Sequence, residues 1–158
     1  MSLFEDSAYI WRETFFLMFD RANRPDIDNV QACLADMGTR YELIKSQAND
    51  DGEIVSLSMR SPQDFSAMDI VFVEGEEVKA NLDEMLTELR AQTMTTEERE
   101  KLLTLESCNV RFDILHFEQV NDGKEDEFLD PGGVLIAIER LAQLCEGVGF
   151  DPQSQSIL

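Results

Sequence analysis

The sequence has little histidine, cysteine or positive charge, and each shortage excludes a class of function. Its 158 residues include one histidine, three cysteines, and 13 lysines and arginines against 33 aspartates and glutamates, a net charge of −20. Three cysteines without a Cys-x-x-Cys pair indicate neither a disulfide framework nor a zinc motif. The excess of negative charge argues against direct binding to nucleic acid or to an anionic membrane, since both need a basic protein surface.

Long apolar runs are also missing. No segment approaches the roughly 20 apolar residues that a membrane-spanning helix needs. Residues 1–6 lack the basic start and apolar core of a signal peptide. Unpaired cysteines fit a reducing compartment. We therefore predict a cytoplasmic protein that does not associate with membranes.

The length fits one domain, and the order of periodic segments indicates an α+β fold. Strands are predicted at 14–20, 40–47, 53–60, 68–73, 109–120 and after 147, and helices at 23–38, 76–91, 95–105 and 133–146. We expect a mixed, mostly antiparallel sheet of about five to six strands with helices packed on it, for which a ferredoxin-like arrangement is one candidate. The whole chain, 1–158, is predicted to be a single α+β domain, with residues 1–13 as an N-terminal arm or short helix.

Three local patterns sharpen this prediction. Asp51-Gly52 is typical of a tight turn between two strands, because glycine supplies a positive backbone angle. Thr95 and Glu98 fit a capping box at the start of a helix. The last helix, 133–146, is apolar on most of its surface, so we expect it to be deeply buried.

Two strands are apolar on both alternating faces, at 15–19 and 70–73. A sheet covered on one side only would expose half of these side chains. Either helices occupy both faces, or a second copy of the chain covers the open one. We predict a homodimer on this ground.

His116 is the only histidine, and the strand pattern places it on the same face as Ile114. As a general base it would use Asp113 or Glu118 as its carboxylate partner. Asp113, however, is three residues away and faces the other side of the strand. The favoured interpretation is a partly buried, hydrogen-bonded histidine near the strand end.

Cysteines and acidic residues offer weaker candidates for metal sites. Cys33, Cys108 and Cys145 are predicted to be small buried apolar side chains, the default for isolated cysteines. A transition-metal centre would need ligands from distant segments. No metal, no cofactor and no cofactor-binding residue is predicted.

The segment 121–130 is acidic, and we interpret it as a solvated loop. Loose cation binding is the alternative, by the side chains of Asp122, Glu125, Asp126 and Glu127. Two glycines follow this segment, in Asp130-Pro131-Gly132-Gly133, at the start of the last helix, where backbone amides could meet an anion. We expect Asp130 to cap those amides instead.

Aromatic side chains gather near the N-terminus: Phe4, Tyr9, Trp11, Phe15 and Phe16. We favour a role in the core, where they tie the N-terminal segment down. The alternative is that an exposed tryptophan or tyrosine anchors a partner.

These observations favour a non-catalytic protein-interaction or regulatory module. Its partner would be a protein, preferably one with a basic surface. No residue is assigned a catalytic role, and we lean against an enzyme. The first alternative is a small-molecule-binding protein or enzyme with a pocket near His116, between the sheet and the last helix. The second is an acidic inhibitor, or nucleic-acid mimic, of a basic partner.

Overall fold

The computed structural model describes residues 9–35, 37, 41–119 and 132–158. Its strands are β1 (Tyr9–Phe19), β2 (Glu42–Ala48), β3 (Ile54–Ser61), β4 (Ser66–Val73), β5 (Val110–Gln119), β6 (Val148–Asp151) and β7 (Ser156–Ile157). Its helices are η1 (Arg21–Asn23), α1 (Ile27–Ala35), α2 (Glu76–Arg90), α3 (Thr96–Glu106) and α4 (Gly132–Cys145).

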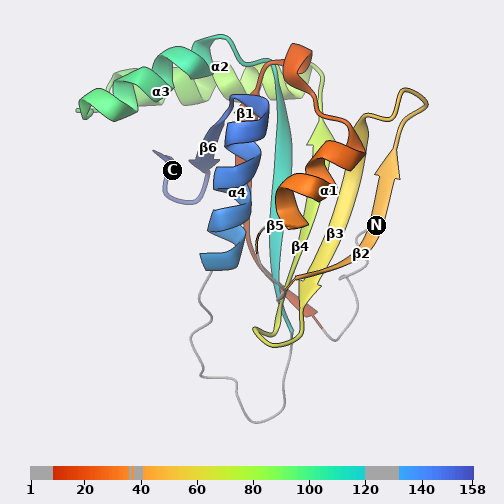
Figure 1. Cartoon of the computed structure of the whole chain (residues 1–158). Coiled ribbons are helices and arrows are strands. Elements are labelled where there is room, and N and C mark those ends of the chain that lie inside the picture. Colours follow the sequence, from red (N-terminus) through yellow and green to blue (C-terminus); the bar gives the residue numbers. More distant parts are fainter. Residues whose placement is uncertain (1–8, 36, 38–40, 120–131) are drawn as a thin grey trace.

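All seven strands form one sheet in the order β2-β3-β4-β5-β1-β6-β7 (Figure 1). Every neighbouring pair is antiparallel. The α+β prediction is confirmed. The sheet has more strands than the five to six expected, because the chain after α4 adds both β6 and the two-residue β7 at one edge.

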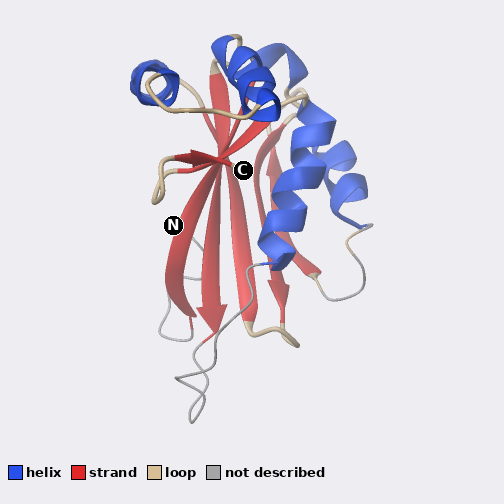
Figure 2. Ribbon diagram, turned by 90° about the vertical axis from the view of Figure 1, so that its left-hand side faces the viewer, coloured by secondary structure: helices blue, strands red, loops and turns tan. Residues whose placement is uncertain are grey.

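The helices lie on both faces of the sheet, as Figures 1 and 2 show. Phe15, Leu17 and Phe19 of β1 point into a core beneath α1 and α4. Met18, between them, points the other way and packs with α2, α3 and β6. Helices therefore bury both sides of 15–19, so this strand does not require a second copy. The homodimer stays a prediction.

Residues 9–13, predicted as part of an arm or short helix, instead begin β1. They pair with the end of β5, from Tyr9 opposite Gln119 onward, and a bulge falls between Trp11 and Glu13. A long neighbouring strand overrides the weak local preference of this polar and aromatic stretch. Residues 1–8 lie outside the described part of the chain.

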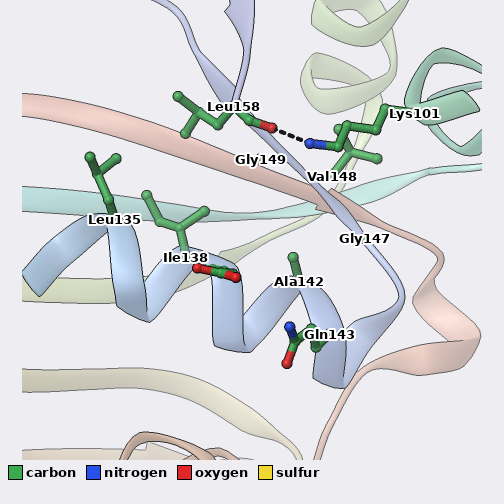
Figure 3. Close-up of a pocket in the computed structure, with 10 residues that line it drawn as sticks. Lys101, Leu135, Ile138, Ala142, Gln143, Gly147, Val148, Gly149 and Leu158 are labelled. Atoms are coloured by element: carbon green, nitrogen blue, oxygen red, sulfur yellow. Dashed lines mark hydrogen bonds between the residues drawn. The ribbon is translucent and has the colours of Figure 1, made fainter. Parts of the chain in front are cut away.

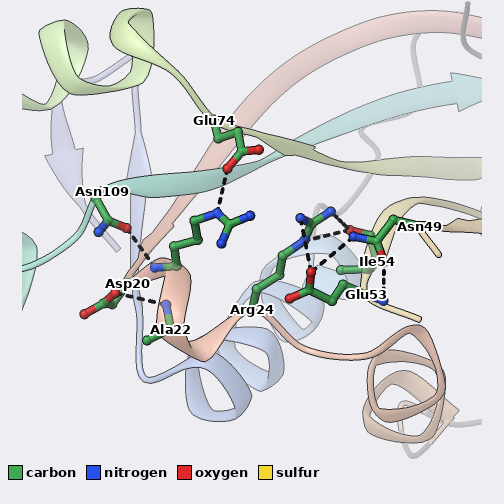
Figure 4. Close-up of polar contacts among 9 residues, drawn as sticks. Asp20, Ala22, Arg24, Asn49, Glu53, Ile54, Glu74 and Asn109 are labelled. Atoms are coloured by element: carbon green, nitrogen blue, oxygen red, sulfur yellow. Dashed lines mark hydrogen bonds and ion pairs between the residues drawn. The ribbon is translucent and has the colours of Figure 1, made fainter. Parts of the chain in front are cut away.

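Polar contacts fix the connection between β1 and α1 (Figure 4). The Arg24 guanidinium donates from Nη2 to the Ile54 carbonyl at 2.7 Å and lies 3.7 Å above the ring of Phe72. Arg21 Nε donates to Glu74 at 2.9 Å. Two of the 13 basic residues thus have structural roles that local pattern did not indicate.

The predicted turn and cap are both confirmed. Gly52 has a φ of +82°, and the Asn49 side chain accepts hydrogen bonds from the backbone amides of Asp51 and Glu53. Thr95 and Glu98 form the capping box of α3. Within the described ranges, no helix combines the length and apolarity that a membrane span requires.

Candidate functional site

The last helix is buried on one side only, which corrects the prediction of deep burial. Val134, Leu141 and Cys145 of α4 pack on the sheet and are fully enclosed. Leu135 and Ile136, on the outer side, remain 39% and 46% exposed. The sequence showed that this helix is apolar nearly all round. It did not show that the sheet and α1 cover less than its full circumference.

A groove of about 540 Å³ lies between α4 and β6, beside the exposed Leu135 (Figure 3). Its volume falls in the range of ligand sites, which is roughly 300–1,000 Å³. The lining is formed by Lys101, Leu135, Ile138, Glu139, Ala142, Gln143, Gly147, Val148, Gly149 and Leu158. Four of these follow the helical spacing i, i+3, i+4 and i+7 on α4, so one stripe of the helix forms one wall.

Two glycines allow the walls of the groove to meet. A Cβ at Gly149 would lie 2.9 Å from Ile138 Cγ2 and 3.3 Å from Leu158 Cβ. A Cβ at Gly147 would overlap the backbone oxygen of Met18. Because Gly149 has no side chain, β6 can lie directly against α4 and Leu158, and because Gly147 has none, the residue before β6 can lie against β1.

Two charged side chains at the rim of the groove, Lys101 and Glu139, differ in whether they have a partner. Lys101 Nζ donates to the Leu158 carbonyl at 2.7 Å and lies 3.9 Å from Glu97 Oε1, so its charge is already shared (Figure 3). Glu139 is exposed and has no ion-pair partner among the residues that the structure describes. The groove therefore combines apolar walls with a carboxylate at its edge that no cation of the described ranges neutralises.

His116 does not line this groove, so the pocket expected between it and the last helix stays a prediction. Its side chain is buried on the α1/α4 face, 2% exposed, with both ring nitrogens in hydrogen-bond range of a partner. Nδ1 is 3.2 Å from Glu13 Oε1, and Nε2 is 3.1 Å from Ser66 Oγ. Tyr41 Oη lies 3.4 Å from the same serine oxygen.

Neither carboxylate proposed from the sequence contacts His116. Arg111 donates to Asp113 at 2.6 Å, and Arg12 pairs with Glu118 at 3.3 Å. The actual partner, Glu13, lies opposite His116 on β1. Strand pairing between residues 103 positions apart brings the two together. No spacing along the sequence could have indicated it.

The cysteines behave as predicted at two positions. Cys108 and Cys145 are buried, and burial raises the pKa of each thiol to about 12. Cys33 is only partly buried, and its thiol donates to the Arg140 carbonyl at 3.4 Å. The described residues contain no group of three or more side chains that could hold a metal ion.

The N-terminal aromatics divide between core and surface. Phe15 is buried, as the core interpretation predicted, whereas Trp11 is 52% exposed and donates from its indole to Thr14 Oγ1 at 3.0 Å. The core interpretation is therefore wrong for Trp11. Phe4, the acidic side chains of 121–130 and the predicted cap Asp130 lie outside the described residues.

Comparisons of the chain with protein-family models, with curated proteins and with solved structures found no match. Functional inference therefore depends on the geometry of the groove and of the histidine network.

Proposed function

We propose that the protein is a non-catalytic interaction module that binds a basic amphipathic helix of a partner protein in the α4 groove. The observation that carries this proposal is the apolar groove itself, beside a helix whose outer leucine and isoleucine side chains remain exposed. Exposed apolar patches next to polar surface are typical of protein-interaction sites.

The shape of the groove suits a helix rather than an extended strand. One wall is the stripe of α4 that begins at Leu135, and the other is formed by β6 and Leu158. A partner helix that places apolar side chains at i, i+3, i+4 and i+7 can insert them between these walls. Burying one leucine in this way contributes about 1.5–3 kcal/mol.

The negative charge of the chain favours a partner helix whose polar face is basic. The net charge is −20, and Glu139 at the rim is unpaired among the described residues. Lysines and arginines on the partner would be attracted during approach, which raises the association rate. This attraction weakens as salt shortens the screening length to about 8 Å at physiological ionic strength.

A designed peptide tests the proposal directly. We expect an 18-residue helical peptide of leucine and lysine at amphipathic spacing to bind with micromolar affinity in fluorescence anisotropy. A peptide of the same composition in scrambled order is the control, because it lacks an apolar face. Affinity should fall several-fold between 50 and 300 mM NaCl. Equal binding of both peptides, or binding that is insensitive to salt, would contradict the proposal.

Two single variants locate the site. Leu135→Ala removes a side chain that lines the groove and should weaken peptide binding about tenfold, the equivalent of about 1.4 kcal/mol. Ile136→Ala removes a neighbouring side chain of similar exposure that does not line the groove, and should leave affinity unchanged. If both weaken binding equally, the peptide lies elsewhere on α4. If the groove instead holds a second copy, Leu135→Ala will change the sedimentation coefficient.

A further inference from the structure

A second hollow, of about 230 Å³, lies where α2 meets the chain around β6. One stripe of α2 forms a wall, because four of the lining residues follow the helical spacing i, i+3, i+4 and i+7, namely Asn81, Glu84, Met85 and Glu88. The opposite wall comes from β1, β6 and the turn that follows β6. The volume is below the roughly 300–1,000 Å³ of sites for drug-sized ligands, so the hollow fits one long side chain.

The floor of this hollow is apolar. Met85 and Phe150 are 4% and 2% exposed and belong to the core that α2 and α3 cover, on the other face of the sheet from α4. Phe16 packs against the same core, and Pro152 adds a further apolar surface. The methylene groups of a lysine or arginine side chain can lie along such a floor while the charged group stays in contact with water.

The rim of the hollow is acidic. Glu84 and Glu88 are both exposed and lie one turn apart on α2, a spacing that places their Cβ atoms about 5–6 Å apart. Neither forms an ion pair with a cation of the described residues. Like charges at this spacing destabilise a helix, and a bound cation would remove the repulsion.

Arg111 does not supply that cation. Its guanidinium carbon lies 4.1 Å from the centre of the Phe16 ring, but its Nε donates to Asp113 at 2.6 Å and its side chain is buried. Its charge is therefore shared with its own carboxylate partner, and it does not line the hollow. The two glutamates remain accessible to a cation from outside the chain.

We propose that this hollow binds a single arginine side chain from a basic segment of a partner protein. Charge complementarity selects the occupant, because the acidic rim and the net charge of −20 favour a cation, and the apolar floor favours one with a long stem. A guanidinium carries five N–H donors in a planar fork and can reach both carboxylates, whereas an ammonium is a point charge. Gln155 Nε2 donates to the Pro152 carbonyl at 2.8 Å, which leaves its amide oxygen as a further acceptor.

A short peptide titrated against the full chain tests this proposal. The probe is acetyl-Gly-Gly-Arg-Gly-Gly-amide, which has no apolar face and so cannot fill the α4 groove. The NMR signal of the isotope-labelled Met85 methyl group should shift saturably, with a dissociation constant in the millimolar range. The same peptide with citrulline, which keeps the shape of arginine without its charge, should bind at least about tenfold more weakly. The lysine peptide should bind several-fold more weakly than the arginine peptide.

Two double variants separate the site from the general charge of the chain. Glu84→Gln with Glu88→Gln should weaken binding of the arginine peptide at least about tenfold. It should not lower the unfolding temperature, because it removes a repulsion, so lost binding would not reflect unfolding. Glu77→Gln with Asp83→Asn removes the same charge from exposed positions of α2 that do not line the hollow, and affinity should stay within about twofold.

Equal affinity for the arginine and citrulline peptides, or equal losses in the two double variants, would overturn the proposal. Equal affinity for the lysine peptide would overturn the choice of arginine, and tighter binding of spermidine would assign the hollow to a free polyamine instead. Leu135→Ala, which alters the α4 groove, should leave this affinity unchanged, so failure at one site is distinguishable from failure at the other. If Leu135→Ala weakens binding of the arginine peptide, the peptide lies in the α4 groove and the proposal is wrong.

Discussion

Burial sets the reactivity of individual side chains in this protein, and the cysteines show it most directly. Cys108 and Cys145 have thiol pKa values raised to about 12, because the charged thiolate would lose its hydration in the core. At pH 8 such a group is ionised in about one molecule in ten thousand. Cys33 is partly accessible to solvent.

We therefore expect one thiol of the native protein to react readily with Ellman's reagent at pH 8, and three after unfolding in guanidinium chloride. Cys33→Ala should abolish the rapid reaction. Rapid reaction of two or more thiols in the folded state would show that the core opens easily.

The raised pKa values of Cys108 and Cys145 also make stability depend on pH. These thiols ionise at lower pH in the unfolded chain than in the folded protein, so the free energy of unfolding should fall as pH rises from about 9 towards 12.

At the scale of single elements, α3 depends on its N-terminal cap more than the other helices do. Leu105 is the one fully buried residue of this helix, so tertiary packing holds it weakly. Thr95 Oγ1 accepts from the Glu98 amide at 3.1 Å, and Glu98 accepts from the Thr95 amide at 3.3 Å. These bonds satisfy two backbone donors that would otherwise lack a partner.

Thr95→Ala should lower the free energy of unfolding by about 1 kcal/mol, measured by urea denaturation. Amide hydrogen exchange should accelerate in α3 before it does elsewhere. Thr96→Ala, at the next position, removes a similar hydroxyl that caps nothing and should stay within about 0.5 kcal/mol of wild type. Equal losses in both variants would mean that the cap contributes little.

Elements whose signals are local were also the ones that the sequence predicted well. The turn at Gly52, the capping box at Thr95 and the extents of α2 and β5 depend on neighbouring residues. The start of β1 at Tyr9 was not predicted, because its stability comes from pairing with β5 about 100 residues later. The exposed side of α4 was missed for the same reason, since it depends on what the sheet leaves uncovered.

The whole molecule carries an excess of 20 negative charges. Among the described residues, the ion pairs with a buried arginine are Arg24 with Glu53 and Arg111 with Asp113. In most ion pairs among the described residues at least one of the two side chains is exposed. Such pairs contribute little to the stability of the fold. Glu84 and Glu88 lie one turn apart on α2, beside a second hollow lined by Phe16 and Phe150. Mutual repulsion therefore works against the folded state.

Added salt should stabilise this protein rather than destabilise it. We expect the unfolding temperature to rise by several degrees between 20 and 500 mM NaCl, because screening reduces the repulsion.

Replacing Glu84 and Glu88 by glutamine should raise the free energy of unfolding at low salt by about 0.2–0.5 kcal/mol. Variant and wild type should converge at 500 mM NaCl. An unfolding temperature that falls with NaCl would show that attractive ion pairs dominate.

The sequence by itself determined the α+β class, the acidic surface, the caps and turns, and which segments are apolar, because each is encoded by residues close together in the chain. The tertiary structure decided which apolar segments face solvent and which polar groups meet. Ser66 is 50 residues from His116, and Glu13 is 103 residues from it. They touch because β4, β5 and β1 are neighbours in the sheet. Strand order is set by how all the elements bury their apolar surface together, so no local pattern contains it.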